Sequence, residues 1–444
     1  MTVPVLTTDA ALKPVFPPRS SRLVQVDVLR GIAIVLVLFR HANISSEEAG
    51  ALKPLVLHLY YFSACGIDLF FVLSGFLIGG LVFKEVRTTG GIDVRRFLMR
   101  RGLRIWPPYL AFIAYVFVRL CRRKMYTAAS AFRAIVPNLL HVQNYFGSPR
   151  GITWSLAVQE HFYLALPLFL VVALKLRRRS GAIAAVPVAA AFLVVVSTTL
   201  RVLLNWNRPY NMWTHATPTH LRLDGLFVGV LVAYLYHFHP QPLARLARRR
   251  AVLALAGCAM IAPAFFLDEG SVPYTWTLGY TLLYLGFACI LVVSIHSPLG
   301  DAGGPGLAGL MTHLAAGLAT IGVFTYSIYL WHYDLGALPV HNYVLAHLAQ
   351  KPPELYWALG TSVYFATAIA AGILMAKMIE LPVIRLRDRL LPGRASAARG
   401  VAPAPSVLGR PLIAVSPSPA RALSLEQESL WRSSPVPVAE RKIE

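Results

Sequence analysis

The chain has 444 residues, of which 56% are hydrophobic and only 14% are charged. Soluble domains carry charge on about a quarter of their residues, so the composition excludes a soluble globular protein and predicts a polytopic membrane protein. The net charge of +22 does not indicate a nucleic-acid partner, because the cations gather in short runs between apolar segments, as cytoplasmic loops and contacts with anionic membrane lipids require.

Residues 1–21 are polar, contain proline and lack the pattern of a signal peptide, which predicts a cytoplasmic N-terminal arm. Apolar runs of bilayer-crossing length follow, and we predict an all-α bundle of about ten transmembrane helices over residues 22–390. Residues 391–444 are rich in Pro, Ser, Ala and Arg, which predicts a disordered cytoplasmic tail. The predicted spans are 23–41, 62–83, 105–119, 155–175, 181–204, 221–238, 251–267, 274–296, 314–335 and 355–384.

The first span carries two ionisable groups, Arg30 and His41, eleven residues apart. At about 100° and 1.5 Å per residue, this spacing places both on nearly the same helix face, about 16 Å apart. Ionisable groups in a span usually face the protein interior and mark function. Here they are a permanent cation and a proton acceptor for neutral pH. The alternative is a snorkelling arginine and an interfacial histidine.

The charges of the loops orient the bundle. Loops 84–104, 175–179 and 245–250 are rich in Lys and Arg, whereas the loops predicted to lie outside carry few cations. This asymmetry predicts both termini in the cytoplasm, with Arg30 toward the cytoplasm and His41 toward the outside. The segment 119–150 disagrees, because it carries six cations on the predicted outer side. Either a span is missed there, or a basic outer loop meets an anionic partner.

Several polar residues interrupt later apolar runs. Ser74 lies in a glycine-containing run and is read either as a helix-packing residue or as part of a site. Arg100, Arg101 and Arg104 flank a span on the inside, where they either set the topology or bind phosphate groups bidentately. Glu160 is predicted at the outer edge of its span, as an interfacial carboxylate or as the partner of an imidazole base.

Two acid–base pairs and one further histidine complete the set of polar residues. Arg222 with Asp224, and Glu380 with Arg385, are read as structural bridges or as site residues, and His332 is predicted at an outer helix end. The four cysteines show no metal-ligand spacing, so no metal site is predicted.

The order of these motifs resembles acyltransferase family 3. Members are integral-membrane O-acyltransferases, typically with ten helices, that modify sugars of surface polysaccharides, lipid-linked glycans or macrolides. The resemblance covers about residues 22–390. It departs from the family pattern at Gln159, where the family has Glu, and at Asp334, where it tends to have Pro. The matching motifs are Asp27-x-Leu29-Arg30-Gly31 with Arg30-x10-His41, Phe70-Phe71-x-x-Ser74-Gly75-Phe76, Arg100-Arg101-x-x-Arg104-Ile105-x-Pro107-x-Tyr109, Trp154-Ser155-Leu156, Phe162-Tyr163, Pro167, Arg222-x-Asp224, Tyr329-Leu330-Trp331-His332 and Glu380-x-Pro382.

The resemblance implies transfer of an acyl group, with acetyl expected, from acyl-CoA as donor substrate to a hydroxyl of a glycan or glycosylated acceptor. It implies no permanently bound cofactor and a place in the bacterial inner membrane. His41 would be the general base or a transient acyl carrier. Arg30, oriented by Asp27, would hold the donor or balance its charge. The remaining assignments are Glu160 as a partner of the base, and Arg100, Arg101, Arg104 and Ser74 as the CoA-binding residues.

Two other classes of protein remain open. A transporter or flippase would line its substrate path with the same intramembrane charges. An inactive family member acting as a membrane partner is the other alternative, because Gln159 replaces the family's carboxylate.

Overall fold

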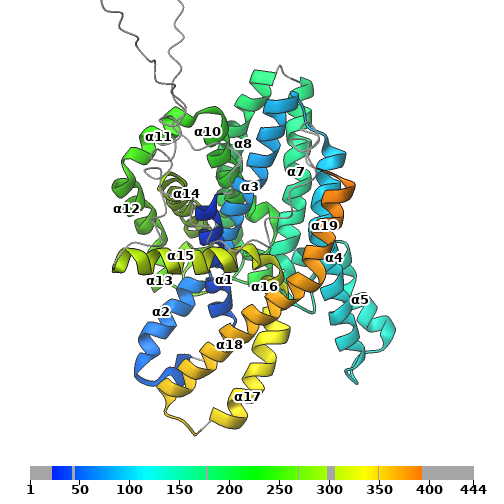
Figure 1. Cartoon of the computed structure of the whole chain (residues 1–444), viewed down its shortest axis with the longest axis vertical. Coiled ribbons are helices and arrows are strands. Elements are labelled where there is room, and N and C mark those ends of the chain that lie inside the picture. The colour runs from blue at the N-terminus through cyan, green and yellow to red at the C-terminus, as the bar shows by residue number, and fades with distance from the viewer. Residues whose placement is uncertain are drawn as a thin grey trace, which may run out of the picture. The chain divides into compact units, whose positions relative to one another are not determined.

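The computed structural model describes residues 23–42, 46–176, 179–268, 270–297, 306–348 and 350–392. Every regular element within these ranges is a helix, and no strand occurs among them (Figure 1). This confirms the all-α prediction. The predicted arm, 1–21, and the predicted tail beyond residue 392 lie outside the described residues.

Each predicted span coincides with one helix or with two consecutive helical elements. By length and composition, six helices qualify as membrane spans, or up to eight if each of two bent pairs is one span, so the count of ten is not confirmed. The helices that carry the predicted spans are α1 (Val24–Arg40), α3 (Gly66–Thr89), α4 (Val94–Cys121), α7 (Trp154–Leu176), α8 (Arg179–Asn207), α10 (Leu223–Phe238), α12 (Arg250–Ile261) with α13 (Pro263–Phe266), η4 (Thr275–Gly279) with α14 (Tyr280–His296), α15 (Leu307–Val323) with α16 (Thr325–Trp331), and α18 (Pro353–Met375) with η6 (Ala376–Glu380).

Helix α1 is shorter than a typical span. Its 17 residues rise about 25 Å, less than the roughly 30 Å of a bilayer core. Figure 1 shows it in the middle of the bundle, where it packs against α3 and α15. Eight of its residues are buried, including Leu29, Ala33 and Val37. Helix α1 is therefore an internal helix around which the longer spans are arranged.

Shorter helices join the spans. The basic segment 119–150 contains α5, whose 12 residues rise only about 18 Å. No span is therefore missed there, which leaves the second reading, a basic outer loop, and its anionic partner stays a prediction. The connecting helices are α2 (Lys53–Ser63), α5 (Ala128–Leu139), α6 (Gln143–Phe146), α9 (Met212–His215), α11 (Pro240–Arg248), α17 (Leu338–Leu348) and α19 (Leu381–Leu390), with short turns η1 (Ser46–Leu52), η2 (Gly151–Thr153), η3 (Thr219–Leu221) and η5 (His332–Ala337).

The outer helices expose apolar side chains. On α8, the side chains of Val188, Phe192 and Val195 are more than 60% exposed. Large exposed apolar surfaces are typical of helices that face lipid and not of helices that face water.

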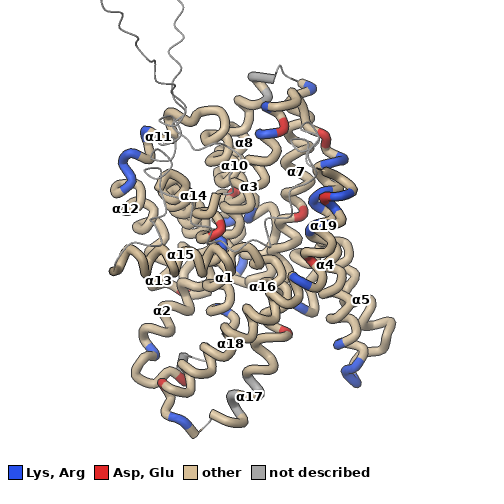
Figure 2. The backbone as a smooth tube through the Cα atoms, viewed as in Figure 1, with Lys and Arg blue, Asp and Glu red and all other residues tan. Residues whose placement is uncertain are grey.

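The cations lie in separate groups. Figure 2 shows them at α11, along α19 with the adjoining end of α4, and around α5. The first two groups belong to the loops predicted to be cytoplasmic.

Two glycines set the distance between α1 and α15. A Cβ atom added to Gly31 would lie 2.1 Å from the carbonyl oxygen of Leu318, and one added to Gly322 would lie 1.9 Å from the carbonyl oxygen of Asp27. Both contacts are with backbone, which cannot rotate away. The two helices are therefore as close as their backbones allow, a packing that small residues make possible inside membranes.

We expect Gly322→Ala to destabilise the protein by about 2 kcal/mol, because the added methyl group forces α1 away from α15. Thermal or urea unfolding in detergent measures this loss. Gly317→Ala is the matched control on the same helix, because a Cβ at Gly317 meets nothing within 4 Å. That control is expected to be neutral or slightly stabilising, and equal effects of the two substitutions would contradict the packing argument.

Candidate functional site

Two imidazoles lie side by side in the interior. The ring centroids of His41, which follows the last residue of α1, and His332 are 5.1 Å apart, with the rings inclined by 62°. His332 is fully buried, whereas His41 is half-buried. The structure thus adds His332 to the site predicted around His41. The motif Tyr329-Leu330-Trp331-His332 was the available signal, but no spacing rule connects two residues 291 positions apart.

Backbone hydrogen bonds define the tautomer of both rings. Nδ1 of His41 lies 2.8 Å from the carbonyl oxygen of Val37, and Nδ1 of His332 lies 2.7 Å from that of Tyr329. A carbonyl oxygen only accepts, so each Nδ1 carries the proton and each neutral ring keeps its lone pair on Nε2. Neither Nε2 has a hydrogen-bond partner among the described residues. Each imidazole can therefore take up a proton at Nε2.

The chain reaches His332 through an irregular helix. The helix pair α15 and α16 is bent by 66°, and α16 continues into the π-helical turn η5, which begins at His332. A π-helical turn adds a residue to the helical repeat and frequently occurs at functional sites. The turn therefore changes the direction of His332 relative to a regular continuation of α16.

The segment 148–155 holds both flanks of His332. Before it, the Tyr329 hydroxyl lies 2.8 Å from Ser155 Oγ and donates to the carbonyl oxygen of Ile152. After it, the buried carboxylate of Asp334 receives two hydrogen bonds from Arg150, at 2.6 and 2.7 Å. Asp334, one of the departures from the family pattern, is thus the anchor of the basic segment.

The interaction with Asp334 is strong enough to change the pKa of Arg150. Burial by itself lowers the pKa of its guanidinium, but the hydrogen bonds and the negative charge of Asp334 outweigh burial and leave the pKa raised. Arg119 contributes a longer contact of 3.6 Å to the same carboxylate. Two of the six cations in segment 119–150 are therefore neutralised within the protein.

Arg30 lies at the other end of α1 from His41. Its guanidinium donates to Thr325 Oγ1 at 2.7 Å, where α16 begins, and lies 3.5 Å from the Asp27 carboxylate. The predicted contact between Asp27 and Arg30 is thus present. Thr325, which accepts the hydrogen bond from Arg30, and His332, which lies beside His41, belong to the same short stretch of chain. Both ends of the predicted donor path therefore lie between α1 and this stretch.

Three of the predicted arginines converge on one tyrosine. The charges of Arg101, Arg104 and Arg30 all act on the hydroxyl of Tyr163, which is buried on α7. Arg101 and Arg104 are half-buried, and neither forms an ion pair with a residue that the structure describes. Tyr163, whose hydroxyl donates to Gln159 at 3.1 Å, was not among the predicted site residues.

Arg100 is directed elsewhere. Its guanidinium lies 3.3 Å from the Asp388 carboxylate and also donates to the carbonyl oxygen of Leu391. Arg100 therefore links α4 to α19, whereas Arg101 and Arg104 form no such ion pair among the described residues. Its predicted part in binding CoA stays a prediction.

Glu160 and Ser74 are also apart from the imidazoles. Glu160 accepts a hydrogen bond from Trp106 Nε1 at 3.2 Å and is within the field of Arg101, and no contact between its carboxylate and His41 occurs among the described residues. Ser74 is half-buried and makes no hydrogen bond within the described part of the chain. Both remain predicted site residues without a geometric link to His41.

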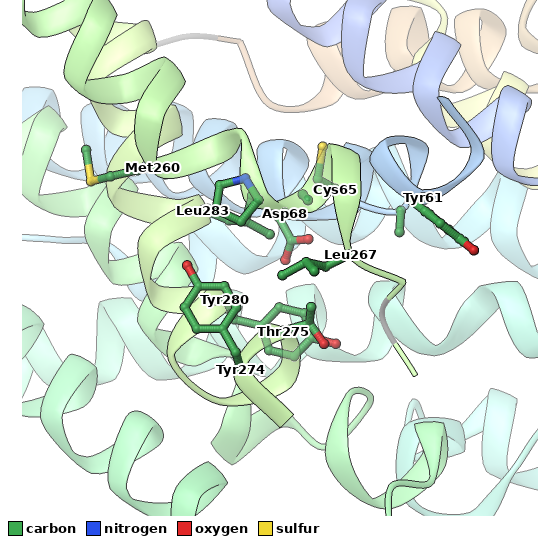
Figure 3. A pocket seen from close by; sticks show the side chains of 13 residues that line it. Tyr61, Cys65, Asp68, Met260, Leu267, Tyr274, Thr275, Tyr280 and Leu283 are labelled. Atoms are coloured by element: carbon green, nitrogen blue, oxygen red, sulfur yellow. The ribbon is translucent and has the colours of Figure 1, made fainter. Parts of the chain in front are cut away.

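The predicted bridge between Arg222 and Asp224 does not form. Arg222 pairs with Asp68 of α3 at 2.6 Å, and Asp224 pairs with Arg201 of α8 at 2.7 Å. Asp68 also lines a pocket between the α2–α3 junction, α12–α13 and η4–α14, whose other walls are mostly apolar (Figure 3). None of the predicted catalytic or CoA-binding residues lines this pocket.

These features define a membrane protein whose helix bundle encloses two proton-accepting imidazoles and a group of arginines. Comparison with known families identifies it further: residues 23–397 match the acyltransferase domain of acyltransferase family 3. The chain belongs to this family, which confirms the resemblance drawn from the motifs. No solved structure matches the chain.

Curated relatives carry more specific names. The O-acetyltransferase OatA of Staphylococcus aureus is 25% identical over 363 residues, which cover 75% of this chain and 55% of the relative. The peptidoglycan O-acetyltransferase OatA of Listeria monocytogenes is 25% identical over 384 residues, which cover 81% of this chain and 55% of the relative. The chain thus spans about half the length of the curated relatives it matches.

We expect Asp334→Asn to destabilise the protein by about 3 kcal/mol, because it leaves the partly buried Arg150 without its counter-charge. Unfolding in detergent measures the loss. Arg150→Met combined with Asp334→Leu should recover most of it, since no charge then stays buried. Arg119→Gln serves as control: its longer contact comes from a side chain that is 36% exposed, so it should cost less than about 1 kcal/mol. A loss for Arg119→Gln equal to that for Asp334→Asn would contradict the assignment of Arg150 as the main partner.

Proposed function

We propose that the chain is a membrane O-acetyltransferase that transfers an acetyl group from acetyl-CoA to a hydroxyl of a glycan, with peptidoglycan as the first acceptor to test. The observation that carries the proposal is the lone pair on Nε2 of His41, beside His332, in a chain of the acyltransferase family. The acceptor follows the names of the relatives, which include a peptidoglycan O-acetyltransferase.

In the proposed reaction, His41 acts as the general base. Its Nε2 removes the proton of the acceptor hydroxyl while the oxygen attacks the thioester carbonyl carbon. The C–S bond then breaks, and the thiolate of CoA takes the proton from His41. The hydrogen bond from Nδ1 to Val37 keeps the ring in the tautomer that this step requires. General-base assistance of this kind contributes about 10²- to 10⁴-fold to the rate.

The arginines would receive the donor. Arg101 and Arg104 have no ion-pair partner among the described residues, and guanidinium groups bind phosphate oxygens in pairs of hydrogen bonds. Arg30 lies about 16 Å along α1 from His41, on the path that the pantetheine arm would follow. The donor would therefore enter from the cytoplasmic side and present its thioester to His41 near the outer side of the inner membrane.

We expect His41→Ala to lower the rate of acetyl transfer at least about 100-fold. The assay supplies purified protein in vesicles with labelled acetyl-CoA and a peptidoglycan fragment, and counts label on the glycan. Retained CoA binding in the variant shows that the fold is intact. Transfer by His41→Ala at the parental rate would rule out the base assignment. Flux of the glycan across the vesicle, without transfer or CoA binding by the parent protein, would instead favour the transporter.

The donor site has its own test. We expect the double variant Arg101→Ala with Arg104→Ala to raise the KM for acetyl-CoA at least about 10-fold, because charge-assisted hydrogen bonds to phosphate are lost. The KM for acetyl-pantetheine, a donor without phosphate groups, should stay unchanged. Arg95→Ala is the control, since Arg95 is exposed on the same helix. An equal effect on both donors would show that the arginines do not bind the phosphates.

A further inference from the structure

His332 has a feature that packing does not explain. Its side chain is 0% exposed, and its Nε2 is buried without a hydrogen-bond partner. An unsatisfied polar atom in the interior destabilises the fold, so such atoms are rare unless a substrate or a transient proton satisfies them. A leucine would fill the same volume without this cost. What distinguishes this atom from other buried nitrogens without a partner, such as Nε2 of His215, is the second imidazole beside it, that of His41.

The surroundings of His332 limit that role. The titratable and charged groups near the two rings are His41, Arg40, Tyr329, Tyr333, Asp334 and Arg150. Asp334 is the nearest carboxylate along the chain, but Arg150 engages both of its oxygens. No carboxylate near His41 is thus left, among the described residues, to stabilise its protonated form. The ring of His41 lies instead beside that of His332, with the centroids 5.1 Å apart.

We propose that His332 is a second imidazole of the transfer site, whose neutral ring, with its lone pair on Nε2, stabilises the cation that His41 becomes during the reaction. The proposal rests on the proposed function. When the O–H bond of the acceptor breaks, an N–H bond forms at Nε2 of His41, and the ring becomes a cation. His332, neutral and with its lone pair on Nε2, stabilises this cation until the thiolate takes the proton. His332 acts through His41 and is therefore a positioning residue.

The segment 148–155 would support this arrangement. Tyr329 and Asp334 are both tied to it, and His332 lies between them at the start of the π-helical turn. Any displacement of this segment would move the acceptor nitrogen relative to His41. The inference therefore also explains why a buried ion pair is placed two residues from His332.

The test compares His332→Asn with His332→Gln. Asn retains a donor for the Tyr329 carbonyl oxygen but has no acceptor in the place of Nε2, whereas the longer Gln side chain can offer its amide oxygen there. We expect His332→Asn to lower kcat about 10- to 100-fold, as loss of a hydrogen bond to a charged group does, with both KM values within about twofold of the parent. His332→Gln should recover part of kcat.

His215→Asn is the matched control. His215 is equally buried and its Nε2 also lacks a partner, but its ring neighbours are Tyr210 and Trp276 rather than a second imidazole. We expect His215→Asn to keep the parental kcat. Rates are expressed per CoA-binding molecule, so that a low yield of folded variant does not enter the comparison.

The pH profile separates stabilisation of the cation from a general disturbance of the site. Without His332, the protonated form of His41 is less stable, so the acid limb of kcat in His332→Asn should move to lower pH. A fall in kcat by the same factor at every pH, or a parental rate in His332→Asn, would overturn the inference. Loss of transfer in the parent protein itself, or an active His41→Ala, would instead overturn the proposed function.

Discussion

The contact between α1 and α15 is the constraint on which the arrangement of the site depends. Gly31 and Gly322 allow the two backbones to approach until no Cβ fits between them. Because α1 is a single helix, this contact sets the positions of Arg30 and His41 together. Because α15 leads directly into α16, the contact also sets Thr325 and, about two turns further on, His332 at the start of η5. A helix crossing at which no side chain separates the two backbones thus positions both ends of the predicted donor path, Arg30 and His41.

The rest of the interior follows a rule of paired charges. Asp68 with Arg222, Asp224 with Arg201, and Asp334 with Arg150 each join segments far apart in the sequence. Removing one partner of a buried pair costs about 3–5 kcal/mol, because the other charge is left uncompensated. Against this background, polar groups that remain without a partner are informative. Among the described residues these include Nε2 of His332 and, without an ion pair, the guanidinium groups of Arg101 and Arg104.

The sequence predicted the helices better than the contacts between them. The apolar runs fall on helices, although the count of ten spans is not confirmed, and the spacing of Asp27 and Arg30 predicted their contact, because helix geometry relates residues of one helix directly. Contacts between helices depend on rotation and register, which local patterns do not encode. This is why Arg222 pairs with Asp68 instead of Asp224, why Arg100 turns away toward Asp388, and why Tyr163 was not predicted. The π-helical turn at His332 likewise has no local sequence signature.

The length of α1 also has an electrostatic consequence. A cation 4 Å from an imidazole disfavours its protonation by about 4 kcal/mol at an effective dielectric constant near 20, whereas a cation about 16 Å away does so by only about 1 kcal/mol. If Arg30 binds a negatively charged donor, as proposed, its distance still allows His41 to take up a proton. Arg40, next to His41 in the sequence, is directed over the ring of Tyr60 at 4.0 Å. A base and a cation that binds an anionic donor need opposite electrostatic surroundings, and about three turns along one helix are enough to separate the two proposed groups.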